Sequence, residues 1–166
     1  MQWIENEELF ATELAQGFLW QMKVAQYLKQ QGFAIKVPDI RFRDDVQEIN
    51  KFEDEPDIHW CGKVFEVKSR KLHFTGPHDF PYQTILVDTV RGWQSKTHKP
   101  DTYICISTVT EAMICLPGET QKDWIQCPRF DHIRKIKDTF YEAPKNLWIS
   151  MDTLIQQMHT YLRYQC

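Results

Sequence analysis

A single predicted β-hairpin around Cys61-Gly62 constrains this 166-residue chain more than any other stretch of it. Alternating polar and apolar residues lie on both sides of the dipeptide, and two residues of this kind form the commonest hairpin loop. The loop fixes the register, so that Trp60 pairs with Lys63 and Asp57 faces Glu66. Everything inferred below about chemistry depends on this register.

The register also separates the side chains by type, because neighbouring residues of a strand point to opposite faces. The apolar face collects Ile58, Trp60, Phe65 and Val67. The polar face collects Asp57, His59, Val64, Glu66 and Lys68. Two carboxylates opposite each other repel unless they share a proton or a cation lies between them. Carboxylate oxygens suit Mg²⁺ or Mn²⁺, and an ammonium on the same face can stabilise charge that develops at a phosphate.

The rest of the chain predicts one mixed α/β domain over residues 1–166, because helical and strand patterns alternate and no linker or repeat interrupts them. Helices are predicted at 7–31, where Gly32 suits the C-terminal cap, at 88–96, and after Ser150 or Asp152. Strands are predicted at 33–37, 84–87, 103–107 and 112–116. Residues 39–56 are polar and acidic and are predicted to be a loop, and 140–149 holds apolar snippets of uncertain type.

Composition excludes several classes. No apolar run reaches the roughly 20 residues of a membrane helix, and the acidic N-terminus does not resemble a signal peptide. We therefore expect a cytoplasmic protein without membrane contact. Its five cysteines form no CxxC pair, which disfavours structural zinc and disulfides. A hydrolase that uses a Cys-His pair stays open, although no pair stands out.

Net charge is informative only when the chain is divided. The formal charge is −3 overall, but residues 1–57 carry 12 acidic and 6 basic side chains, whereas residues 58–166 carry 11 and 14. The second part is therefore net basic, as a surface that contacts phosphates requires. We expect weak affinity for DNA without metal and stronger affinity when a divalent cation is present.

Pro56-Asp57, followed after eight residues by Glu66-Val67-Lys68, resembles the signature of the PD-(D/E)XK nuclease superfamily. That resemblance implies a restriction-endonuclease-like αβββαβ core with a mixed central sheet flanked by helices. It implies that Asp57 and Glu66 bind a divalent metal, that Val67 adds its carbonyl, and that Lys68 assists the attacking water. The expected activity is metal-dependent hydrolysis of DNA phosphodiester bonds with Mg²⁺ or Mn²⁺.

Members of this superfamily often place a Glu on the first helix, facing the site. Gln21 stands at about that position on the apolar stripe of the first predicted helix, and Glu13 is the other candidate. Lys71 and Lys96 are weaker candidates for contacts with nucleic acid, because they follow the motif strand and end the next predicted helix.

Two alternatives remain open at this stage. A non-catalytic nucleic-acid-binding or assembly module on the same fold would explain the amide at position 21 and the net negative charge of the chain. Superfamily members that cut both DNA strands are often dimers, so the resemblance implies that a homodimer is possible. The sequence shows no apolar stripe of the kind that a dimer interface would need. The compact chain resembles phage or bacterial endonucleases that process DNA, by analogy of fold alone.

Overall fold

The computed structural model describes residues 2–39, 56–131 and 135–165, with side chains in the first helix described only at residue 12 and from residue 15 onward. The predicted acidic loop at 39–56 thus lies almost wholly outside the described residues. Along the chain the helices and strands are α1 (Gln2–Gln30), β1 (Ile58–Trp60), β2 (Lys63–Arg70), β3 (Thr84–Thr89), α2 (Val90–Ser95), β4 (Thr102–Ser107), β5 (Met113–Pro117), β6 (Ile125–Asp131), β7 (Ile136–Pro144), β8 (Ile149–Ser150) and α3 (Met151–Gln165). Short 3₁₀ turns cover Pro77–Asp79, Gly118–Asp123 and Lys145–Leu147.

Helix α1 ends where the glycine signal predicted it. Gly32 has φ +91°, and its N–H donates to the carbonyl of Lys29, while the N–H of Phe33 donates to Leu28. This left-handed cap turns the chain back toward the sheet. Residues 33–37 were predicted to be a strand, and this prediction is wrong: they form one isolated bridge, from Lys36 to His59. Pro38 lacks the N–H that a longer ladder would need.

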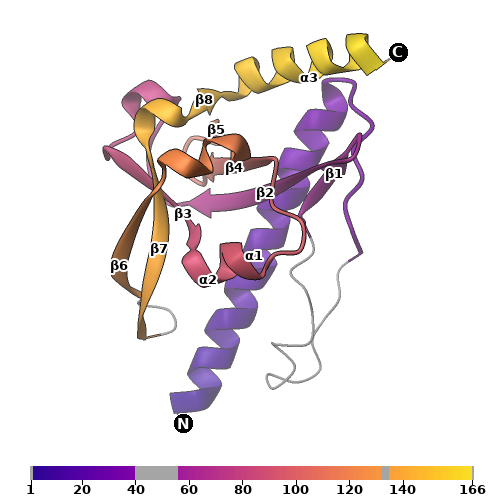
Figure 1. Cartoon of the computed structure of the whole chain (residues 1–166). Coiled ribbons are helices and arrows are strands. Elements are labelled where there is room, and N and C mark those ends of the chain that lie inside the picture. The colour runs from indigo at the N-terminus through magenta and orange to yellow at the C-terminus, as the bar shows by residue number, and fades with distance from the viewer. Residues whose placement is uncertain (1, 40–55, 132–134, 166) are drawn as a thin grey trace.

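A mixed five-stranded sheet forms the centre, in the order β1-β2-β4-β5-β8. Strands β2 and β4 run parallel and the other pairs are antiparallel, which confirms an α/β protein with a mixed sheet. Helices α1 and α3 cover one face of this sheet (Figure 1). The buried helix residues on that face are Val24, Ala25, Leu28, Met151, Leu154 and Met158, and they pack on sheet residues such as Ile58, Phe65 and Ile104.

A second, antiparallel sheet of order β3-β7-β6 lies with α2 against the other face. Its buried residues Ile85, Tyr141 and Ala143 pack on Tyr103 and Leu116 of the central sheet. Strands β6 and β7 were not predicted from the sequence. Figure 1 shows the β6–β7 hairpin extending away from α3, with α2 between it and α1 in this view. No helix in the described part of the chain has the length and apolarity to span a lipid bilayer.

The turn after β5 lies directly on the backbone that precedes β4. The N–H of Gly118 donates to the carbonyl of Asp101 over 2.8 Å, and a Cβ on Gly118 would lie 2.1 Å from the carbonyl oxygen of Pro100. Asp101 in turn accepts from the N–H of Val64 through its carboxylate and donates to Val64 through its own N–H. Gly118 is therefore required for the close approach of the two backbones.

Replacing Gly118 with Ala is expected to lower the free energy of unfolding by about 1–3 kcal/mol or more, because the new methyl group must push backbone apart. Gly17→Ala is the matched control: nothing lies within 4 Å of a Cβ there, and Ala in the interior of a helix gains up to about 1 kcal/mol over Gly. Urea denaturation followed by circular dichroism measures both. Equal stability of the two variants would contradict the packing described here.

Candidate functional site

The hairpin has the predicted register. Trp60 pairs with Lys63 and Ile58 pairs with Phe65, with Cys61 (φ +46°) and Gly62 (φ +76°) in the loop. Positive φ at both loop residues is the geometry of a type I′ turn, which matches the twist of the strands that it joins. The loop therefore sets which residues of β2 face the interior between the two sheets.

The ladder between β1 and β2 ends at the pair of Ile58 and Phe65, and Pro56 explains why it does not continue. The next hydrogen-bonded pair after Ile58 and Phe65 would join Pro56 to Val67, but Pro56 has no N–H to donate. Instead, the carboxylate of Asp57 accepts the N–H of Val67 over 2.6 Å. The predicted cross-strand pairing of Asp57 with Glu66 thus lies just outside the ladder. Pro56 therefore cannot donate a hydrogen bond to the carbonyl of Val67. That carbonyl belongs to the residue whose N–H the Asp57 carboxylate accepts.

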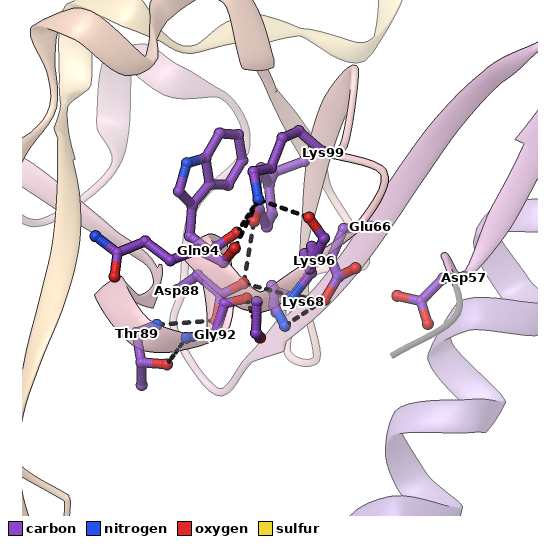
Figure 2. Close-up of polar contacts among 12 residues, drawn as sticks. Asp57, Glu66, Lys68, Asp88, Thr89, Gly92, Gln94, Lys96 and Lys99 are labelled. Carbon is purple, nitrogen blue, oxygen red and sulfur yellow. Dashed lines mark hydrogen bonds and ion pairs between the residues drawn. The ribbon is translucent and has the colours of Figure 1, made fainter. Parts of the chain in front are cut away.

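Glu66 and Lys68 lie on one face of β2 and form an ion pair of 2.7 Å, as their spacing of two residues predicts. The Glu66 side chain is 10% exposed and that of Lys68 is 29% exposed. Lys68 is thus the member of the pair that keeps access to solvent. In Figure 2 the carboxylate of Asp57 points toward the side of the site where Glu66 and Lys68 lie.

A second lysine reaches Glu66 from the end of α2. The ammonium of Lys96 lies 2.8 Å from Asp88 and 3.7 Å from Glu66, and its side chain is only 4% exposed. Asp88, near the end of β3, also accepts the hydroxyl of Tyr103 over 3.0 Å. Tyr103 is the neighbour of Glu66 in the parallel β2–β4 register. Four elements thus bring their polar groups to one place.

Short local bonds hold the α2 end of this cluster. The carbonyls of Trp93 and Lys96 each accept the ammonium of Lys99 over 2.6 Å, which places a cation at the C-terminal end of the helix (Figure 2). At the other end, the hydroxyl of Thr89 accepts the N–H of Gly92 as an N-cap. The backbone of Lys96 is therefore fixed by its own helix turn.

Electrostatics keep both lysines charged. Burial lowers the pKa of Lys68, but the carboxylates of Glu66 and Asp88 outweigh it, so the pKa lies above its ordinary value. The same balance raises the pKa of Lys96. Burial raises the pKa of Asp88, yet the two ammonium groups outweigh it and hold that pKa below its ordinary value. Lys68 is consequently a cation at neutral pH.

Gln21, a candidate from the apolar stripe of α1, contacts the backbone that leads into β1. Its amide donates to the backbone carbonyl of Asp57 over 2.7 Å and so ties α1 to the residue that precedes β1. Glu13 is part of α1, but its side chain lies outside the described ones. Lys71 is exposed directly after β2. Lys96 belongs to the site itself, and its burial leaves little surface for a nucleic-acid backbone.

The donor set suits a hard divalent cation with few protein ligands. Within the described part of the chain, no group of three or more His, Cys, Asp or Glu side chains is arranged around a common metal position. Mg²⁺, however, is commonly bound through one or two carboxylates, with waters and substrate phosphates as the other ligands. The carboxylates of Asp57 and Glu66 and the carbonyl of Val67 supply oxygens of this kind.

Sequence reasoning missed Asp88 and Tyr103. The helix was predicted to begin at Asp88, whereas the residue belongs to β3 and α2 begins two residues later. The one signal in the sequence is a carboxylate within the otherwise uncharged stretch from Thr84 to Val90. Tyr103 reads as an ordinary aromatic strand residue until the parallel pairing places it beside Glu66.

Comparisons with models of protein families, with curated proteins and with solved structures gave no match to this chain. Its function must therefore be inferred from the chemistry of the site.

The buried pair of Asp88 and Lys96 is expected to show strong coupling. Asp88→Asn and Lys96→Met should each cost up to about 3–5 kcal/mol of unfolding free energy, since each leaves a buried charge without its nearest counter-charge. The double variant should lose clearly less than the sum of the two. Chemical denaturation of the four proteins completes the double-mutant cycle.

Lys23 provides the control for this cycle, because its ion pair with Glu111 joins side chains that are 42% and 55% exposed. Lys23→Met should cost less than about 1 kcal/mol. Additive losses at Asp88 and Lys96, within about 0.5 kcal/mol, would show that the two charges do not depend on each other.

Proposed function

We propose that this protein is a divalent-metal-dependent deoxyribonuclease that hydrolyses phosphodiester bonds at the edge of β1 and β2. The observation that carries the proposal is that the Asp57 carboxylate accepts the N–H of Val67, the residue between the ion-paired Glu66 and Lys68, beside a Val67 carbonyl to which Pro56 cannot donate. Hard oxygens and a fixed cation are what hydrolysis of a phosphodiester needs.

The order of elements supports a restriction-endonuclease-like core. From α1 to β4 the chain runs helix, three strands, helix, strand, which is the αβββαβ order. The first two strands form the motif hairpin, and β4 lies parallel to β2. One feature departs from a single central sheet, because β3 pairs with β7 in the second sheet.

The two lysines have different roles in this proposal. When bound, Mg²⁺ or Mn²⁺ would supply a Lewis acid for the phosphate and lower the pKa of a water molecule. Lys68, charged and partly exposed, donates hydrogen bonds to the attacking water or to a phosphate oxygen. Lys96 is buried and lies within ion-pair distance of both Glu66 and Asp88, so its charge offsets the repulsion between these two carboxylates. Gln21 holds the backbone of Asp57.

Purified protein is expected to cleave DNA with Mg²⁺ or Mn²⁺ and to be inactive with EDTA. Single-stranded, duplex and branched DNA are the substrates to compare. Lys68→Ala and Asp57→Asn should each slow cleavage about 100-fold or more, because Lys68 stabilises negative charge in the transition state and Asp57 would hold the metal ion that does the same. Asn can still accept the N–H of Val67, so Asp57→Asn tests the charge rather than the fold.

Lys29→Ala is the control for Lys68, since Lys29 is an exposed lysine in the last turn of α1 and is not a candidate for contact with nucleic acid. It should keep most of the cleavage rate. The proposed function fails if the wild-type protein cuts none of the three substrates, or if the Asp57 and Lys68 variants cut as fast as wild type.

A non-catalytic nucleic-acid-binding module on the same fold is the second candidate. One observation favours it: Glu66 already has two lysines as counter-charges, so its carboxylate is balanced without a metal. The amide of Gln21, at the place where a carboxylate was expected, points the same way.

Calorimetric titration with Mn²⁺ separates the two candidates. For the nuclease we expect saturable binding that disappears in Asp57→Asn and in Glu66→Gln, because each variant removes a charged oxygen ligand. Asp79→Asn, which removes an exposed carboxylate hydrogen-bonded to Thr75 and remote in sequence from the hairpin, should bind Mn²⁺ as wild type does. Binding that is absent from wild type, or equal in all four proteins, favours the non-catalytic module.

A further inference from the structure

Strands β6 and β7 continue as a two-stranded arm past the end of the second sheet. Strand β3 pairs with β7 only from Phe140 to Pro144, whereas β6 pairs with β7 as far as Asp131 and Ile136. Residues 128–131 and 136–139 therefore form a ribbon that pairs with no third strand among the described residues, and we call these residues the arm. At about 3.4 Å per residue, the four pairs extend roughly 14 Å beyond β3. Figure 1 shows this projection below α2.

The arm begins where β3 enters the candidate site. The last two pairs of β3 with β7 join Asp88 to Tyr141 and Thr89 to Phe140, and the arm starts at the next residue, Thr139. Tyr141 also packs on Trp93 of α2, with ring centroids 6.5 Å apart. The arm thus begins within a few residues of the site, close enough to contact a nucleic acid that is bound there.

The two faces of the arm differ in charge. Residues opposite each other in an antiparallel pair share a face, so Phe130 lies with Lys137, and both lie on the face of Tyr141, which is turned toward the protein core. The other residues on this face of the arm are Pro128 and Thr139. Both carboxylates of the arm, Asp131 and Asp138, fall on the opposite face, together with Arg129, which is ion-paired with Glu142. Among the arm residues, the face that continues from the core is therefore cationic and aromatic, without an acid.

The Phe130 and Lys137 face of the arm is exposed to solvent beyond the core. The side chain of Phe130 is 48% exposed, and Lys137 is exposed as well. A two-stranded ribbon has the width to enter the major groove of a DNA duplex. A lysine at its side can contact phosphates, and an aromatic ring can stack on bases or insert at a base step.

We propose that the Phe130 and Lys137 face of the arm is a second contact with duplex DNA, which holds the duplex beside the Asp57, Glu66 and Lys68 site. Charge complementarity selects this partner, since phosphates attract the lysine and no carboxylate on the face repels them. The choice of DNA rests on the proposed function, but the contact itself does not require cleavage.

Binding of a fluorescein-labelled duplex, followed by anisotropy in Ca²⁺, tests the arm. Phe130→Ala with Lys137→Ala should raise Kd about tenfold, since loss of one aromatic–base contact alone has an effect of that order. Lys137→Ala alone should reduce the slope of log K against log salt by about 0.9, the share of one phosphate. Ile136→Ala is the matched control: Ile136 lies on the other face of the same arm and is 42% exposed.

The proposal is overturned if the double variant, folded by its circular dichroism and melting curve, binds within twofold of wild type. It is also overturned if Ile136→Ala weakens binding as much. Light scattering adds a third outcome: a wild-type dimer that the double variant converts to monomer would make this face a contact between two copies of the chain. If the double variant binds DNA more weakly than wild type but the wild-type protein never cleaves DNA, the proposed nuclease function is refuted and the proposed DNA contact of the arm is retained. Unchanged binding in an active enzyme refutes only the arm.

Discussion

The structure is organised around a carboxylate that lies between two sheets. Glu66 is 10% exposed and is held by Lys68 on its own strand and by Lys96 at the end of α2. Removing such charges from water costs several kcal/mol for each ion, so they remain stable only in a nearly complete set of partners. Asp88 and the hydroxyl of Tyr103 complete that set. The second sheet, which carries Asp88, is therefore linked to the first by charge as well as by apolar packing.

The local part of this arrangement could be predicted from the sequence. A two-residue loop fixes its strands without help from the rest of the chain, so the pairing of Trp60 with Lys63 and the shared face of Glu66 and Lys68 followed from position alone. The end of α1 at Gly32 is also local, because a left-handed cap depends on one residue type.

The remaining part depends on contacts between distant segments. Asp88 meets Lys96 and Tyr103 only after β4 has paired with β2 and the second sheet has packed on the first. Strands β6 and β7 escaped prediction because β6 is exposed along nearly its whole length and shows no alternation of buried and exposed residues. Its place in the fold is fixed by pairing with β7, which no local pattern records.

Pro56 removes a backbone donor from the end of the β1–β2 ladder. An ordinary residue at that position would extend the ladder by one pair and occupy both polar atoms of Val67. With proline there, the N–H of Val67 turns to the side chain of Asp57, and its carbonyl receives nothing from Pro56. The strand is thus one pair shorter than its neighbours would permit, and the carbonyl of Val67 lacks the ladder donor that an ordinary residue at position 56 would supply. In the proposed metal site an interruption of secondary structure, rather than an added side chain, would thus supply one of the oxygen ligands.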